Sequence, residues 1–167
     1  MEPDAETLER LRRSGIRIDR EGQFIHEGQP VLHEGLRQAL FRWLDRQPDE
    51  DRYVLRLDAR RFAYVDVDDT PLVVRALRIA GDQAPAEIRL ELSDGREEPL
   101  DPATLTIDEA GILRCWVRGG RLEARLSTSA AAALAERITD SPAGPMLSLP
   151  GAESPAPIRR RSPARSG

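Results

Sequence analysis

The densest group of reactive side chains in the sequence is an acidic run within YVDVDDTPLVVR, residues 64–75. Asp66 and Asp68 alternate with valines, so on a strand both carboxylates point to one face, while Asp69 falls at the Thr-Pro turn. Such carboxylates can bind a metal, transfer protons or simply face water. A calcium loop would also need a glycine turn and a later bidentate acid, which this segment lacks. We therefore predict a solvated strand face with no metal, and keep Asp69 as a residue at the rim of a ligand site.

A second candidate site is a glycine turn flanked by arginines: Arg118, Gly119, Gly120 and Arg121, with Arg125 following. Glycines leave backbone N–H groups accessible, arginines donate paired hydrogen bonds to carboxylates or phosphates, and a predicted helix begins just downstream. The pattern predicts an anion site, and the alternative is a hairpin turn with solvated arginines. For an anion site, Arg118→Ala should weaken binding and leave stability nearly unchanged. If Arg118 instead pairs with an acid of the neighbouring half, the same change should lower the melting temperature, and a ligand screen should find no binding.

The single cysteine, Cys115, suggests a thiol nucleophile with His26 or His33 as its base. However, Cys115 stands between Leu113 and Val117 on one face of a predicted strand, where cysteine acts as a small buried hydrophobe. The sequence offers no third group to orient a base. We therefore predict no catalytic residue, no cofactor and a chain that is not an enzyme. One cysteine also excludes an intrachain disulfide.

The charge distribution bears on possible partners. All 25 basic residues are arginine, and residues 1–150 hold 28 acids against 21 arginines, a balance of −7. Residues 151–167 hold four arginines and one acid. A body this acidic argues against general nucleic-acid binding, which needs a basic surface. The sequence has no apolar run of about 20 residues and no apolar leader segment, so we expect no membrane span and a cytoplasmic protein.

Hydrophobic periodicity predicts an α+β protein. The expected elements are an N-terminal helix in 1–14, a hairpin in 16–31, a helix over 33–47, strands at 52–58, 61–69, 71–80 and 86–94, a hairpin in 105–120 and a helix over 127–140. The short spacing between strands favours an antiparallel sheet. The Arg-, Pro- and Ser-rich residues 151–167 are expected to be disordered.

Two segments of the chain share one pattern. Ile18-Asp19-x-x-Gly22 and Ile107-Asp108-x-x-Gly111 each continue into a strand, a glycine turn and a helix, at an offset of 89 residues. This order predicts two duplicated hairpin–helix units around an antiparallel sheet, at residues 15–80 and 81–150.

The opening IRIDREGQFIHEGQPV, the helix after it and YVLRLDARRFAYVDVDDTPLVV resemble the bacterial family called domain of unknown function 1285. The family opening reads I-D-x-x-G-x-W-x-H-x-G-x-P-I, and its later glycine turn is similar to VRGGRLEA at 117–124. The resemblance covers residues 15–140. The chain departs from the family at Phe24, where Trp is usual, at Leu72, where Phe is usual, at residues 59–61, and in the additional Arg121.

The resemblance implies a duplicated α+β core whose later half is similar to pleckstrin-homology folds. It also implies a nucleotide-like ligand between the halves and a role in signalling, and no enzymatic activity is established for the family. We therefore expect a non-enzymatic ligand-binding or regulatory module for an anionic or nucleotide-like ligand. The alternative is a protein–protein interaction domain without a small-molecule ligand. Neither the ligand nor a protein partner can be identified from the residues alone.

Overall fold

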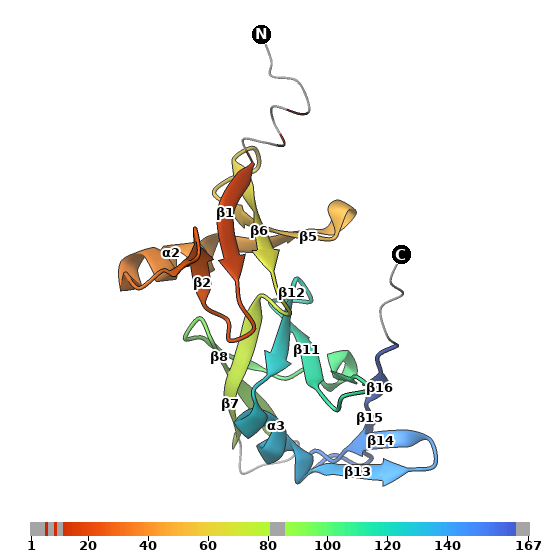
Figure 1. The fold of residues 1–167 in the computed structure, drawn as a ribbon. Coiled ribbons are helices and arrows are strands. Elements are labelled where there is room, and N and C mark those ends of the chain that lie inside the picture. Colours follow the sequence, from red (N-terminus) through yellow and green to blue (C-terminus); the bar gives the residue numbers. More distant parts are fainter. Residues whose placement is uncertain (1–5, 7–8, 10–11, 81–85, 163–167) are drawn as a thin grey trace. The chain divides into compact units, whose positions relative to one another are not determined.

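In the computed structural model the chain forms two compact units, Met1–Pro71 and Leu72–Gly167 (Figure 1). The structure describes residues 6, 9, 12–80 and 86–162. The predicted N-terminal helix falls largely outside these residues. The sequence predicted a boundary between the two parts after residue 80, whereas the strand over residues 72–80 belongs to the second unit because it pairs with later strands.

The first unit contains one helix and a six-stranded mixed sheet in the order β3-β2-β1-β6-β5-β4. Its elements are β1 (Arg13–Ile18), β2 (Phe24–His26), β3 (Gln29–Pro30), α2 (Glu34–Trp43), β4 (Leu44–Gln47), the short 3-10 helix η1 (Pro48–Glu50), β5 (Arg52–Arg56) and β6 (Phe62–Val67). Strands β1 and β6 run parallel and every other pair in this sheet is antiparallel.

Local chemistry forms the first hairpin. After β1, Asp19 Oδ1 accepts hydrogen bonds from the N–H groups of Glu21 and Gln23 at 3.0 and 2.8 Å. Gly22 takes a left-handed φ of 80° and donates its N–H to the Asp19 carbonyl. A turn of this kind requires positive φ at its fourth residue, where glycine is favoured. This requirement explains the Asp-x-x-Gly spacing.

Helix α2 is shorter than predicted. His33 caps its N-terminus, and Phe41 packs edge-to-face on Phe24 of β2 with ring centroids 4.8 Å apart. The periodicity predicted a helix to residue 47, but the helix ends at Trp43 and residues 44–47 pair with β5 as β4. Leu44 is buried at the start of β4, and its position also fits the apolar spacing of the helix, so that spacing does not mark the boundary.

The second unit contains a seven-stranded sheet in the order β16-β10-β11-β12-β7-β8-β9 and a three-stranded sheet in the order β13-β14-β15. Its elements are β7 (Leu72–Ala80), β8 (Glu87–Leu92), β9 (Glu97–Pro99), the 3-10 helix η2 (Pro102–Thr104), β10 (Thr106–Ile107), β11 (Leu113–Val117), β12 (Leu122–Leu126), α3 (Thr128–Ala135), β13 (Ile138–Ser141), β14 (Gly144–Leu147), β15 (Ala156–Pro157) and β16 (Arg159–Arg160).

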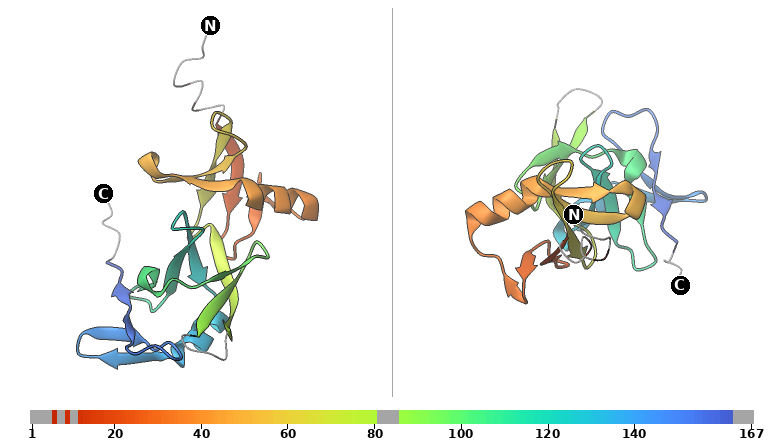
Figure 2. Two further views of the ribbon diagram at one scale, coloured as in Figure 1. Left: turned by 180° about the vertical axis from the view of Figure 1, so that it is seen from behind. Right: turned by 90° about the horizontal axis from the view of Figure 1, so that it is seen from above.

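The prediction of one antiparallel sheet was wrong in part. The hairpins are antiparallel, but β7 runs parallel to β12 and β16 runs parallel to β10. Helix α3 lies against β7 and β12 (Figure 2). Its residues Ala130 and Leu134 are buried. The helix predicted over 127–140 ends at Ala135, and β13 follows. The fold class is mixed α+β, with sheets dominating.

Part of the predicted disordered tail is ordered. Ile158 is buried, and on either side of it β15 pairs with β14 and β16 pairs with β10. One apolar side chain inside a basic segment therefore anchors the chain to the second unit, while residues 163–167 lie outside the described part. No helix among the described residues is long and apolar enough to cross a membrane.

Candidate functional site

The three aspartates of the acidic run lie in different surroundings. Asp68 forms an ion pair with Arg17 of the neighbouring strand β1. Asp66 is exposed and lines a cavity, and no ion pair joins it to a residue that the structure describes. Asp69 is half-buried after the end of β6. Within residues 12–80 and 86–162, no three His, Cys, Asp or Glu side chains gather as a metal site requires.

The predicted anion site forms the turn between β11 and β12. Arg118, Gly119 and Gly120 adopt φ values of 55°, 64° and 84°, so three consecutive residues are left-handed. The N–H groups of Gly120 and Arg121 donate to the Val117 carbonyl at 3.2 and 3.1 Å. The turn therefore uses two of the backbone donors that would have bound an anion.

The Arg118 side chain lies against two carboxylates. Its guanidinium forms an ion pair with Asp94 and another with Glu98, where Nε is 3.1 Å from Oε2. The Arg118 N–H also donates to Glu98 Oε1 at 2.8 Å. The Asp94 side chain is only 3% exposed, and burial lowers the pKa of Arg118. An anion at this turn would have to displace these acids, and binding here stays a prediction.

The remaining predicted site residues are dispersed. Arg121 is exposed in the turn, and Arg125 is half-buried on β12 opposite Arg114 of β11. Asp69 belongs to the first unit, whereas the glycine turn belongs to the second. Arg125 and the turn belong to the same unit, but Arg125 lies along the hairpin from the turn, so the structure does not gather the predicted residues into one site.

Cys115 is buried on β11 opposite Ala124 of β12. Burial raises the pKa of its thiol to about 12, so the thiol is protonated at neutral pH. His33, a candidate base, instead accepts the Leu36 N–H as the cap of α2. This placement agrees with a structural cysteine.

A bulge in β1 opens the sheet of the first unit. Arg13 lies opposite Tyr64 and Arg17 opposite Asp66, so β1 advances four residues while β6 advances two. The Ser14 hydroxyl donates to the Tyr64 carbonyl at 2.5 Å, where a backbone N–H would otherwise donate. Gly15 takes a φ of 68°. Serine followed by glycine thus allows β1 to bulge, so that it has two more residues than β6 over this stretch. Bulges commonly lie beside binding sites.

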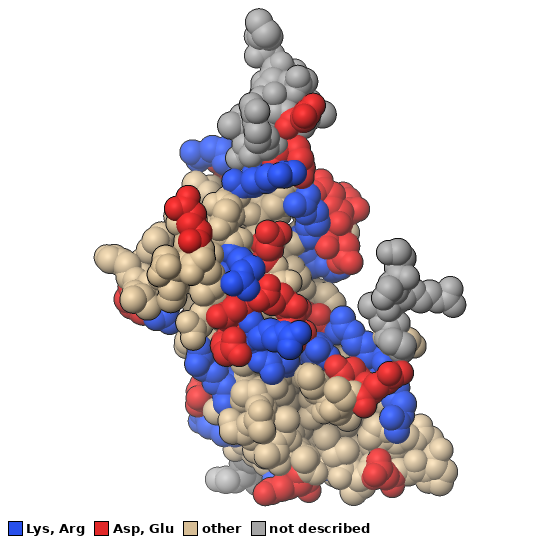
Figure 3. Space-filling view, viewed as in Figure 1, with Lys and Arg blue, Asp and Glu red and all other residues tan. Residues whose placement is uncertain are grey.

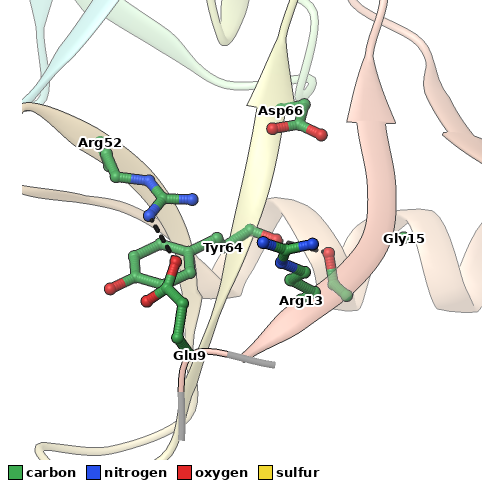
Figure 4. A pocket seen from close by; sticks show the side chains of 7 residues that line it. Glu9, Arg13, Gly15, Arg52, Tyr64 and Asp66 are labelled. Atoms are coloured by element: carbon green, nitrogen blue, oxygen red, sulfur yellow. Dashed lines mark hydrogen bonds and ion pairs between the residues drawn. The ribbon is translucent and has the colours of Figure 1, made fainter. Parts of the chain in front are cut away.

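The cavity of the first unit lies beside this bulge (Figure 4). Its volume is about 360 Å³, and its lining residues are Glu9, Arg13, Ser14, Gly15, Arg52, Tyr64 and Asp66. Small-molecule sites commonly have volumes of about 300–1,000 Å³, so this cavity suits a small ligand. Four of the seven lining residues are charged, which favours a charged ligand over an apolar one.

On one side of the cavity, the polar and charged side chains already interact with one another. The Arg52 guanidinium lies over the Tyr64 ring, 3.4 Å from its centroid, and forms a 3.0 Å ion pair with Glu9. The Tyr64 hydroxyl donates to Glu50 Oε2 at 2.7 Å. This hydrogen bond to a carboxylate, followed by burial, raises the pKa of Tyr64. The phenol therefore stays protonated, and its ring face is covered.

The other side of the cavity presents two charges that no described residue neutralises. Arg13 and Asp66 both line the cavity, on neighbouring strands, and neither forms an ion pair within the described part of the chain (Figure 4). Further along the same two strands, Arg17 and Asp68 are paired. In the same sheet, therefore, one arginine and one aspartate neutralise each other, whereas the other arginine and aspartate have no ion-pair partner among the described residues.

Sequence reasoning missed this cavity. The sequence predicted an N-terminal helix in 1–14, whereas β1 begins at Arg13. The cavity depends on the parallel pairing of β1 with β6, two segments about 50 residues apart, and neither segment alone signals that pairing. The one local signal is the Ser-Gly step between Arg13 and the alternating Ile16-Arg17-Ile18.

Comparison with known proteins shows a similarity of fold. No family model and no curated protein matches the sequence. The structure is similar to that of a DUF1285 family protein from Silicibacter pomeroyi DSS-3, with a TM-score of 0.71 and 22% identity, covering 88% of this chain and 80% of the other. It is also similar to a DUF1285 family protein from Shewanella baltica OS155, with a TM-score of 0.54 and 17% identity, covering 68% and 84%.

These likenesses establish the class of fold: an α+β fold shared with DUF1285 family proteins. The resemblance predicted from the sequence is thereby confirmed. The sequence identities are too low to transfer a ligand or a residue role.

Proposed function

We propose that this chain is a non-enzymatic binding protein for a small molecule with an anionic group, and that the ligand occupies the cavity of the first unit. The observation that carries the proposal is the position of Arg13. It is an exposed cation that lines a 360 Å³ cavity and has no ion-pair partner among the described residues. An arginine so placed donates paired hydrogen bonds to a carboxylate or phosphate.

The groups in the cavity that could act as nucleophiles or bases favour binding over catalysis. The Ser14 hydroxyl donates to a backbone carbonyl and also accepts the Ile16 N–H. The Tyr64 hydroxyl donates to Glu50, and its raised pKa keeps it protonated. An activated nucleophile needs an adjacent base that removes its proton, and these hydroxyl protons are directed elsewhere.

Within each unit, arginine and acidic side chains of the described residues are interleaved on the face shown in Figure 3. Discrete small anions suit this pattern better than a polyanion does. The narrower expectations remain predictions: a nucleotide-like ligand held between two halves, the site at residues 118–121, and a signalling role.

A thermal-shift screen tests the proposed function. The probes are inorganic phosphate, acetate, nucleoside monophosphates and L-amino acids at millimolar concentration. At least one should raise the melting temperature of the chain, and Arg13→Gln should remove most of that rise. Arg60→Gln is the matched control, since Arg60 is exposed in the same unit and does not line the cavity. A shift that survives Arg13→Gln would place the ligand elsewhere.

We also propose that the two units are copies of one ancestral unit. Asp108 accepts hydrogen bonds from the N–H groups of Ala110 and Ile112 just as Asp19 accepts them from Glu21 and Gln23. In the first unit the strand order is β3-β2-β1-β6-β5-β4, and the matching order in the second unit is β12-β11-β10-β16 followed by β15-β14-β13. In each unit the last strand of the repeat, β6 or β16, runs parallel to the first strand of the hairpin, β1 or β10. A likeness of the later half to pleckstrin-homology folds stays a prediction.

A protein–protein interaction domain is the second candidate. Leu32 is 80% exposed just before the cap of α2, and Leu36 is 45% exposed in its first turn. Exposed apolar side chains that lie together mark surfaces that proteins bind. In affinity purification with isotope-labelled comparison, a real partner would be recovered with the native chain and lost with Leu32→Ser plus Leu36→Ser.

A further inference from the structure

We propose that the ligand of the first-unit cavity is a small zwitterion of the amino-acid type, with its carboxylate on Arg13 and its ammonium group on Asp66. This inference rests on the proposed function and narrows it. It adds a second recognition group, Asp66, and a requirement for a cation on the ligand.

Charge balance in the cavity favours a zwitterion. The cavity is lined by two arginines, Arg13 and Arg52, and by two acids, Glu9 and Asp66, so its formal charge is zero. Arg52 and Glu9 neutralise one another at 3.0 Å. A ligand that binds Arg13 through an anion alone would leave Asp66 beside that anion, and like charges in a shared site repel. A ligand with both charges satisfies both residues.

The spacing of Arg13 and Asp66 fits a ligand of this size. Arg13 lies opposite Tyr64, and Asp66 lies two residues further along β6 on the same face. Two residues of a strand cover about 7 Å, and neighbouring strands lie about 4.8 Å apart. The two side chains therefore reach from separate places toward one cavity, as Figure 4 shows. A molecule the size of an amino acid suits the separation between these two side chains.

The cavity is poorly suited to larger ligands. A nucleotide gains affinity when its base stacks on an aromatic face, but the Tyr64 side chain is buried and Arg52 already covers its ring. The cavity volume lies near the lower end of the range for small-molecule sites. A phosphate chain would also lie beside two carboxylates.

Isothermal titration calorimetry with matched probes tests this inference. L-amino acids are titrated first, and the tightest binder is then compared with its N-acetyl derivative, which lacks the cation, and with its amide, which lacks the carboxylate. Each derivative should bind about 10- to 100-fold more weakly, the effect of one charge-assisted hydrogen-bonding contact. Asp66→Asn should abolish the preference for the free amine, and Arg13→Gln should abolish the preference for the free carboxylate.

The controls are Glu21→Gln and Arg60→Gln, two exposed positions of the same unit away from the cavity. If the N-acetyl derivative binds as well as the amino acid and both depend on Arg13, the zwitterion inference fails while the proposed function holds. The zwitterion inference also fails, and the proposed function holds, if a nucleoside monophosphate binds more tightly than every amino acid through Arg13. If no anionic probe depends on Arg13, both fail.

Discussion

Arg118 and Asp94 form an ion pair that joins the turn after β11 to the end of β8, and the Asp94 side chain is almost fully buried. Glu98 adds a second carboxylate to the same guanidinium. Arg118 also holds a left-handed φ of 55°, which is unfavourable for a residue with a Cβ. The two acids thus stabilise an arginine in a conformation that would otherwise favour glycine.

Arg118→Ala should therefore destabilise the chain. Removing the guanidinium leaves the buried Asp94 carboxylate without its cation, and breaking a buried pair costs about 3 kcal/mol or more. Urea denaturation of Arg118→Ala, Asp94→Ala and the double variant measures this coupling. The double variant should lose much less than the sum of the singles. A change below about half a kcal/mol for Arg118→Ala would show that the turn does not depend on this pair.

Asp108→Ala should lower the free energy of unfolding by about 1–2 kcal/mol, since it removes two backbone hydrogen bonds and the ion pair with Arg114. Asp19→Ala should lower it by a similar or smaller amount, because Asp19 holds the matching turn of the first unit. Asparagine at either position keeps the turn and should cost less than alanine. Equal losses for asparagine and alanine would contradict the turn-holding role.

The same aspartate makes stability depend on pH. The hydrogen bond from Arg114 and, next, that from the Ile112 N–H hold the pKa of Asp108 below its usual value. Its stabilising contribution is therefore fully present above about pH 4, its ordinary pKa, and is lost as the pH falls through the lower folded pKa. Asp108→Asn should show a smaller decline in unfolding free energy between about pH 5 and about pH 2. An identical decline would assign the acid sensitivity to other carboxylates.

His33→Ala should destabilise the chain by about 1 kcal/mol, because His33 Nδ1 accepts the Leu36 N–H at 3.2 Å as the cap of α2. His33→Ser should retain most of that energy. A Cβ at Gly35 would lie 3.1 Å from His33 Cε1. Gly35→Ala should consequently stabilise the helix more in the His33→Ser background than in the native chain. Thermal melts of the four proteins measure this difference, and additive effects would refute the contact.

Cys115 should not react with a disulfide reagent in the folded chain. Burial raises the pKa of its thiol to about 12, and only a thiolate reacts quickly. Labelling should follow global unfolding across a urea series. Rapid labelling in native buffer would show that β11 opens locally.

Local chemistry explains which features could be predicted from the sequence. The turns after Ile18 and Ile107 depend on an aspartate and a glycine three residues later, so a short window contains their cause. The burial of Cys115 followed from its alternation with Leu113 and Val117. Such features need no information from distant parts of the chain.

Features that depend on distant pairing could not be predicted. Leu44 continues the apolar spacing of α2, yet it pairs with Leu55 as the start of β4. Ile158 is one apolar residue in a basic tail, and its burial became evident only from the pairing of β16 with β10. Arg118 was expected to bind a ligand, whereas its acidic partners come from residues 94 and 98, more than a dozen positions away.

The most direct test of the central claim is the dissociation constant of the tightest L-amino acid, measured by isothermal titration calorimetry for the native chain, Arg13→Gln and Arg60→Gln. Arg13 lines the cavity and no described residue neutralises its charge, whereas Arg60 lies away from the cavity. We predict saturable binding that weakens about 10- to 100-fold in Arg13→Gln and is unchanged in Arg60→Gln. Equal dissociation constants for all three proteins, or no binding by the native chain, would contradict the claim.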